Sequence, residues 1–192
     1  IRITQCIDAG DQASPTPGVQ VVVDFSLPSA WNHLRDYLAR TDAALVSGTT
    51  GLGESENELL REWSRDRPVF YSSNMSVGVF VLNRLMGLAD SLLDDSFDRE
   101  LIEFHHNRKL DSPSGTALTL LGNWPEGTPA HSVRGGDIAG EHHLHYMGPG
   151  ERLVLSHMAT DRRIFALGAL RAVRFIAGVN EPGLYGMEDL FG

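Results

Sequence analysis

The chain has 192 residues, with 25 acidic residues against 16 basic ones, so its formal net charge is −9. Fifteen of the basic residues are arginines and one, Lys109, is a lysine. An acidic chain without basic clusters argues against nucleic acid or an anionic membrane as a partner, because both require a positive surface. The hydrophobic content of 42% is typical of a folded protein.

The cysteine count and the hydropathy pattern exclude further classes of protein. A single cysteine, Cys6, rules out an internal disulfide framework and a cysteine-based zinc cluster. No apolar run approaches the 18 residues expected of a membrane span, and no signal-peptide pattern opens the sequence. We therefore expect a cytoplasmic protein without a membrane segment.

The first half of the sequence predicts alternating strands and helices. Runs rich in β-branched and apolar residues at 19–25, 43–47 and 68–72 are typical of buried strands. Helical patterns follow each run, the second at about 55–65 and the third at about 76–93. Repeated strand–helix units predict a parallel sheet with helices on its faces.

Short polar segments follow the three predicted strands, at residues 24–26, 48–51 and 72–75. Parallel strands end at a common edge of the sheet, where ligands bind in folds of this kind. Small and hydroxyl-bearing residues there would let a nucleotide approach the backbone closely. For each segment taken alone, an ordinary strand-to-helix turn is the better interpretation.

Residues that can bind or transfer protons and anions are concentrated at 105–116, directly after a predicted strand at 98–104. His105 and His106 can exchange protons near neutral pH, and Lys109 adds a cation. Residues 112–116 predict the start of a helix, whose free amides favour an anion. Each piece alone is an ordinary surface or capping feature. Together they predict a site for a small polyanion or dicarboxylate.

The remaining sequence predicts an antiparallel hairpin and a last helix. The hairpin strands lie at 144–147 and 152–157, joined by residues 148–151. His143 and His145 share one face of a strand, but no third zinc ligand follows from the spacing, so a solvated strand face is the better interpretation. The helix, at about 161–178, carries Arg171, which is either a carboxylate clamp or a surface arginine.

Residues 103–117 read E-F-H-H-N-R-K-L-D-S-P-S-G-T-A. They resemble the signature of the dihydrodipicolinate reductase family, E-x-H-H-x-x-K-x-D-x-P-S-G-T-A, at every fixed position. Further segments resemble the family in the same order, at residues 23–26, 48–51, 74–79, 134–142 and 165–171. The resemblance extends from residue 19 to about residue 191.

The resemblance implies an α/β protein of two domains. A Rossmann-like parallel-sheet domain at residues 1–75 plus about 171–192 would bind the cofactor. An α+β domain at residues 76–170, with a mostly antiparallel open sheet, would bind the substrate and build a homotetramer. The implied activity is NAD(P)H-dependent reduction of 4-hydroxy-tetrahydrodipicolinate to tetrahydrodipicolinate, on the diaminopimelate route to lysine.

The resemblance also implies roles for individual residues. His105 corresponds to the family's acid/base histidine and Lys109 to its proton-donating lysine. The substrate, a small cyclic dicarboxylate, would be bound by residues that match family contacts or lie beside them: His106, Ser114, Gly115, Thr116 and Arg171. No metal site is implied.

Cofactor contacts are implied for residues after the predicted strands, namely Phe25, Gly48, Thr49, Thr50, Ser72, Ser73, Asn74 and Met75. Asp8 corresponds to an acidic residue that the family places on the adenosine ribose. No arginine follows Asp8 directly, which favours NADH over NADPH.

One feature of the family is missing from the sequence. Nothing matches the G-x-x-G-x-x-G loop that binds the cofactor pyrophosphate. An alternative function is therefore a catalytically silent dicarboxylate-binding homologue without this loop.

Overall fold

The computed structural model describes residues 1–8, 10–11 and 13–192. They form two compact units, the first from residues 1–75 and 166–192 and the second from residues 76–165. The later boundary falls inside helix α5 (Arg163–Ile176), and the domain boundary predicted at about residue 171 lies in the same helix.

The first unit contains a four-stranded parallel sheet with the order β1-β2-β3-β8. Its strands are β1 (Val21–Asp24), β2 (Ala44–Ser47), β3 (Pro68–Tyr71) and β8 (Gly183–Tyr185). The predicted parallel sheet is thereby confirmed. The carboxyl ends of β1, β2 and β3 lie next to one another at one edge of the sheet.

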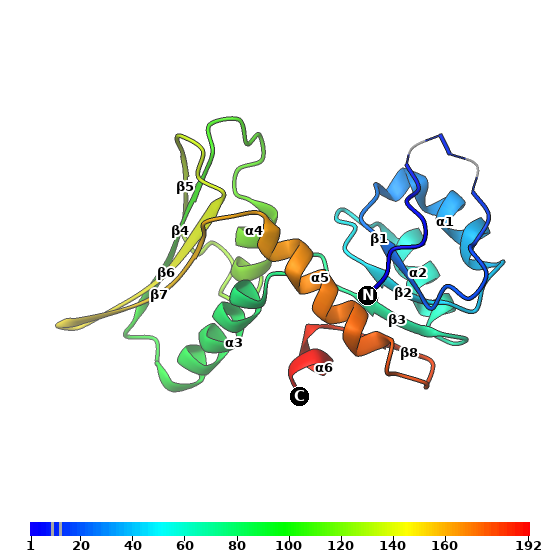
Figure 1. Ribbon diagram of the computed structural model, residues 1–192. Coiled ribbons are helices and arrows are strands. Elements are labelled where there is room, and N and C mark those ends of the chain that lie inside the picture. The colour runs from blue at the N-terminus through cyan, green and yellow to red at the C-terminus, as the bar shows by residue number, and fades with distance from the viewer. Residues whose placement is uncertain (9, 12) are drawn as a thin grey trace. The chain divides into compact units, whose positions relative to one another are not determined.

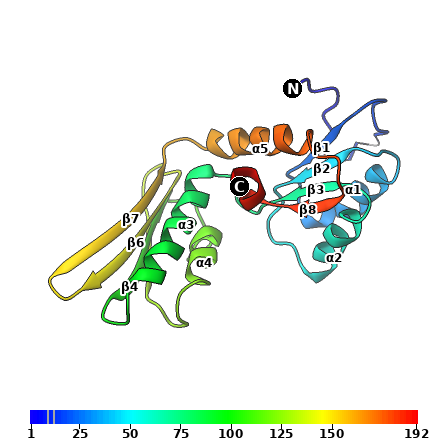
Figure 2. The same ribbon diagram turned by 90° about the horizontal axis from the view of Figure 1, so that it is seen from below.

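Helices cover both faces of this sheet (Figures 1 and 2). On one face, Trp31 and Trp63 lie in contact with their rings tilted by 37° and their centroids 5.4 Å apart, and they pack on Leu45 and Val69. On the other face, Phe70 meets Phe175 of α5 at 6.2 Å. The elements around the sheet are a 3-10 turn (Pro28–Ala30), α1 (Trp31–Leu38), α2 (Glu54–Trp63) and α6 (Met187–Phe191).

The second unit contains a four-stranded sheet with the order β5-β4-β6-β7. Its strands are β4 (Asp98–His105), β5 (Ala130–Arg134), β6 (Gly140–Gly148) and β7 (Glu151–Ala159). Strand β4 is parallel to β5 and antiparallel to β6, and β6 is antiparallel to β7. The predicted mostly antiparallel sheet is confirmed, and its hairpin turns at Pro149 and Gly150, whose φ of +83° suits glycine.

Two helices, α3 (Val77–Leu92) and α4 (Gly115–Leu121), pack on one face of the second sheet (Figure 2). Side chains alternate along a strand, so Leu101, Glu103 and His105 of β4 all point to this covered face and are buried. Leu101 faces Leu144 of β6, and both are fully buried in the core under the helices. The covered face therefore holds an apolar core at one end and ionisable side chains at the other.

Three elements and one segment depart from the sequence expectation. The sequence predicts neither β5, β8 nor α6. Strand β8 and helix α6 are too short to show a periodic pattern, and β5 mixes polar and apolar residues. Residues 1–8 belong to the predicted parallel-sheet domain, but they form no strand. No helix in the described part of the chain is long and apolar enough to span a membrane.

Two glycine substitutions test this packing in opposite directions. A Cβ at Gly168 of α5 would lie 1.7 Å from the backbone oxygen of Met75, so Gly168→Ala should lower the free energy of unfolding by at least about 2 kcal/mol. A Cβ at Gly87 of α3 would meet nothing within 4 Å, so Gly87→Ala should raise it by about 0.5–1 kcal/mol. Urea unfolding measures both, and equal effects of the two substitutions would contradict the packing of α5.

Candidate active site

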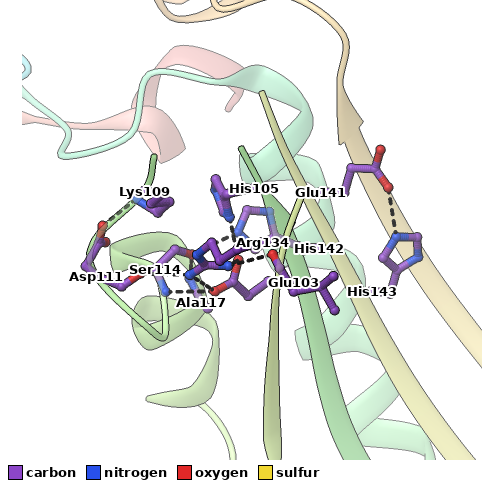
Figure 3. A network of polar contacts seen from close by, with 11 residues as sticks. Glu103, His105, Lys109, Asp111, Ser114, Ala117, Arg134, Glu141, His142 and His143 are labelled. Atoms are coloured by element: carbon purple, nitrogen blue, oxygen red, sulfur yellow. Dashed lines mark hydrogen bonds and ion pairs between the residues drawn. The ribbon is translucent and has the colours of Figure 1, made fainter. Parts of the chain in front are cut away.

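A buried carboxylate, Glu103 of β4, lies at the centre of the ionisable cluster (Figure 3). Arg134 of β5 donates from Nη2 to one carboxylate oxygen at 2.7 Å and from Nη1 to the other at 2.9 Å. The ring Nδ1 of His105 contacts Oε2, and the backbone N–H of Ser114 donates to Oε1 at 3.2 Å. Two adjacent strands and the residue that caps α4 therefore meet at one side chain.

These partners keep the Glu103 carboxyl ionised. Burial by itself raises the pKa of Glu103, but hydrogen bonds from Arg134, Ser132 and His105 outweigh burial and bring the pKa down to about 2. A buried carboxylate is stable only when its oxygens accept strong hydrogen bonds, and the fork-shaped guanidinium supplies two.

His105, at the end of β4, is buried and faces several charged groups. Burial lowers the pKa of His105, the hydrogen bond and charge of Glu103 oppose this effect, and the charges of Lys109 and Arg134 add to it. The other ring nitrogen, Nε2, lies beside Gly140, where a Cβ would come within 2.9 Å of it. The imidazole thus has one nitrogen on a carboxylate and one against a glycine.

A second buried histidine, His142 of β6, packs against the first, with ring centroids 5.4 Å apart. Its Nε2 lies 3.3 Å from the Ser114 hydroxyl, and its Nδ1 is buried without a hydrogen-bond partner in the part of the chain that the structure describes. Burial, followed by the nearby charge of His105, lowers the pKa of His142 to about 4. His142 is therefore neutral at physiological pH.

The loop after β4 carries the only lysine of the chain. Lys109 Nζ pairs with Asp111 Oδ1 at 2.8 Å, and the lysine side chain is only 21% exposed. Ser114 caps α4, since its hydroxyl accepts the N–H of Ala117 at 3.2 Å. Gly115 and Thr116 form the first turn of α4.

The structure brings six of the predicted residues together within the second unit: His105, His106, Lys109, Ser114, Gly115 and Thr116. The Nδ1 of His106 is buried and meets no hydrogen-bond partner among the described residues. Arg171 is exposed on α5 and belongs to the first unit, so the second unit does not bring it to this group.

Glu103, Arg134 and His142 complete the site but are not among the predicted binding residues. The alternation of His142, Leu144 and Tyr146 along β6 could have revealed that His142 points to the covered face. His143 lies on the other face, where it contacts Glu141 (Figure 3). Its Nδ1 also lies 2.9 Å from the Ser156 hydroxyl. Within the described residues, no group of three or more His, Cys, Asp or Glu side chains could hold a metal ion.

The predicted cofactor residues lie in the first unit, mostly at the carboxyl ends of its strands. Buried Asp24, at the end of β1, is hydrogen-bonded to the end of β2. Its Oδ2 accepts from the hydroxyls of Ser47 at 2.9 Å and Thr49 at 2.7 Å. The third end is ordered by Ser72, whose hydroxyl donates to the Asn74 carbonyl at 2.8 Å. Asp8 lies outside the sheet, and its N–H donates to Asp11.

An exposed aromatic side chain lies at this edge. Phe25 is 52% exposed, and its ring lies over Gly48, where a Cβ would come within 2.3 Å of the ring. Thr50 and Gly51, which follow, are exposed. A flat apolar ring beside exposed residues suits contact with a planar ligand. The sequence offers no glycine-rich loop for the pyrophosphate.

Comparison with known proteins identifies the family. A profile described as "Dihydrodipicolinate reductase, N-terminus" matches residues 3–75, and one described as "Dihydrodipicolinate reductase, C-terminus" matches residues 78–191. The chain belongs to the dihydrodipicolinate reductase family.

Individual relatives agree with the profiles. A 4-hydroxy-tetrahydrodipicolinate reductase of Desulfovibrio desulfuricans is 40% identical over 91% of this chain and 76% of its own length. One of Wolinella succinogenes is 42% identical over 91% of this chain and 77% of its own length. A solved structure, dipicolinate-bound dihydrodipicolinate reductase from Paenisporosarcina sp. TG-14, superimposes with a TM-score of 0.73 at 23% identity, over 88% of this chain and 73% of that one. This likeness confirms the fold class.

The lowered pKa of His142 predicts a loss of stability in acid. Its ordinary pKa of 6.5 applies in the unfolded chain and about 4 in the folded protein, so the unfolded state binds more protons between these values. The contribution of His142 to the free energy of unfolding is therefore complete above pH 6.5. It falls by on the order of 3 kcal/mol as the pH drops to 4.

Urea unfolding at pH 7, 5.5 and 4 measures this loss. We expect His142→Asn to show a shallower pH dependence than the wild type, with His145→Asn on the other face of the same strand as the matched control. An equally steep loss in His142→Asn would show that this imidazole is not the source.

Proposed function

We propose that this protein is a 4-hydroxy-tetrahydrodipicolinate reductase, which uses NADH or NADPH to form tetrahydrodipicolinate on the diaminopimelate route to lysine. The observation that supports this proposal most strongly is the buried imidazole of His105 beside Lys109 and the first turn of α4, in a chain of this family. Support for the substrate class comes from the Paenisporosarcina relative, which binds dipicolinate, a ring with two carboxylates.

In this proposal the second unit binds the substrate. Ser114, Gly115 and Thr116 hold one substrate carboxylate at the start of α4, and the imidazole of His106 adds a hydrogen bond. Lys109 balances the substrate's negative charge and donates a proton to the hydroxyl that leaves as water. The proton that the neighbouring ring carbon loses in this dehydration replaces it, so the net uptake remains one proton. Arg171 is proposed as an additional carboxylate clamp from the first unit. Such preorganised donors orient the ring without reorganisation during the reaction.

The reaction consumes one hydride and one proton and releases water. The nicotinamide, when bound, supplies the hydride. His105 protonates the enamine left by hydride addition, and the proton leaves from its Nε2, because Nδ1 is engaged by Glu103. Burial of the ring excludes bulk water from this step.

The first unit is proposed as the cofactor domain. Phe25 and Gly48 would face the nicotinamide, and the contacts would extend over Thr49, Thr50, Ser72, Ser73, Asn74 and Met75. Asp8 would contact the adenosine ribose, and the lack of an arginine after it favours NADH.

We further propose a cytoplasmic homotetramer built through the sheet of the second unit. The helices α3 and α4 pack on one face of this sheet, and partly exposed apolar side chains, among them Val133, Val154 and Met158, lie on the other. A sheet face of this kind suits burial against further copies of the chain.

Oxidation of NADH, with enzymatically generated substrate, measures the activity directly. His105→Ala and Lys109→Ala should each lower kcat by about 10²-fold or more, the scale of general acid–base contributions. Arg108→Ala is the matched control, since Arg108 is exposed and adjacent to Lys109. Turnover near the wild-type level in both His105→Ala and Lys109→Ala would contradict these roles.

Nicotinamide fluorescence distinguishes the reductase from a silent dicarboxylate-binding protein. We expect saturable NADH binding that Gly48→Ala weakens by about 10-fold, because a Cβ there displaces the Phe25 ring. Gly87→Ala, which lies in the second unit, should bind NADH normally. Absence of NADH binding with retained dipicolinate binding would refute the proposed reductase.

A further inference from the structure

Two charged residues beside the site donate no proton or hydride in the reaction proposed above. Glu103 is fully buried and contacts His105, and Arg134, whose side chain is 19% exposed, pairs with Glu103. We propose that Glu103 is a positioning residue for His105 and that Arg134 holds the Glu103 carboxylate in place. This inference rests on the proposed reductase function and deepens it.

The contact with Glu103 selects one tautomer of His105. An ionised carboxylate can only accept a hydrogen bond, so the Nδ1 that contacts it must carry a proton. The neutral imidazole then has its lone pair on Nε2, and Nε2 becomes the atom that takes up and delivers the transferred proton. The carboxylate of a catalytic triad orients its histidine in the same way.

Arg134 fixes the orientation of the carboxylate. Its two terminal nitrogens bind the two oxygens separately, so the plane of the carboxylate cannot rotate freely. The same guanidinium donates to the Asp111 carbonyl at 2.7 Å, in the loop that carries Lys109. Arg134 thereby links the histidine side of the site to the lysine loop.

Glu103 also connects His105 to the substrate-binding segment. Its Oε1 accepts the backbone N–H of Ser114, the residue that caps α4. A shift of the carboxylate would therefore move both the acid/base imidazole and the turn proposed to hold the substrate carboxylate. The geometry explains why a full charge is buried at this position.

The charges around His105 give the arrangement a pH signature. The groups facing it are Glu103 on its own strand, Lys109 on the following loop, Arg134 on β5 and His142 on β6. Only Glu103 raises the pKa of His105, whereas burial, Lys109 and Arg134 lower it. Loss of the Glu103 charge should therefore lower the pKa of His105 further.

The first test compares Glu103→Gln with Glu103→Asp, with the exposed Glu126→Gln as the matched control. We expect Glu103→Gln to lower kcat by about 10²-fold or more and to shift the alkaline limb of kcat/KM to lower pH, because protonated His105 is the active form. Glu103→Asp keeps the charge and should therefore retain part of the wild-type kcat and part of the wild-type position of the alkaline limb. If Glu103→Gln lowered kcat/KM by the same factor at every pH and left the alkaline limb in place, Glu103 would have only a structural role, and this result would overturn the proposal.

The second test needs no substitution at Glu103 and no turnover. Nitrogen-15 NMR of labelled histidines in the full wild-type chain reports the tautomer of His105, with the signal assigned by its loss in His105→Gln. We expect the Nδ1–H form at neutral pH, and the Nε2–H form would overturn the proposal. A wild-type protein without reductase activity would instead refute the proposed function, while the tautomer still reports on Glu103.

Discussion

A buried carboxylate that must stay charged is the constraint on which the second unit depends. Removal of an ionised group from water is costly unless its oxygens are fully hydrogen-bonded. Glu103 meets this requirement only when β5 brings Arg134, β4 brings His105 and the loop before α4 brings the Ser114 amide. The same interaction therefore stabilises the junction of these elements and sets the positions of His105 and Ser114, which are proposed to act in catalysis and substrate binding.

The ionisable residues of the site lie on the same sheet face as the apolar core of the second unit. The two-residue period of β4 turns Leu101, Glu103 and His105 to one face, so an apolar side chain, an ion-paired carboxylate and a buried imidazole follow one another under α3 and α4. On the adjacent β6, Leu144 lies opposite Leu101 and His142 opposite Glu103. Burial that is favourable for the leucines lowers the pKa of both histidines and gives the imidazoles a dry environment.

The sequence predicts most of the fold and the contiguous part of the site. The third predicted strand, at 68–72, agrees closely with β3 (Pro68–Tyr71), and the motif at 103–117 brings His105, Lys109 and Ser114 near one another through local geometry alone. Arg134 could not be foreseen, because it reaches Glu103 only through the parallel pairing of β4 with the short, partly polar β5. Contacts that depend on tertiary pairing leave no signal in residue spacing.

The ionisation of Glu103 tests this account most directly. Carbon-13 NMR of the Glu103 carboxyl, assigned by its loss in Glu103→Gln, follows the group as pH is lowered from 7. The account predicts a carboxylate that remains ionised throughout the pH range in which the protein stays folded, consistent with a pKa lowered to about 2. Protonation near the ordinary value of 4.5 or above, in the folded protein, would contradict it.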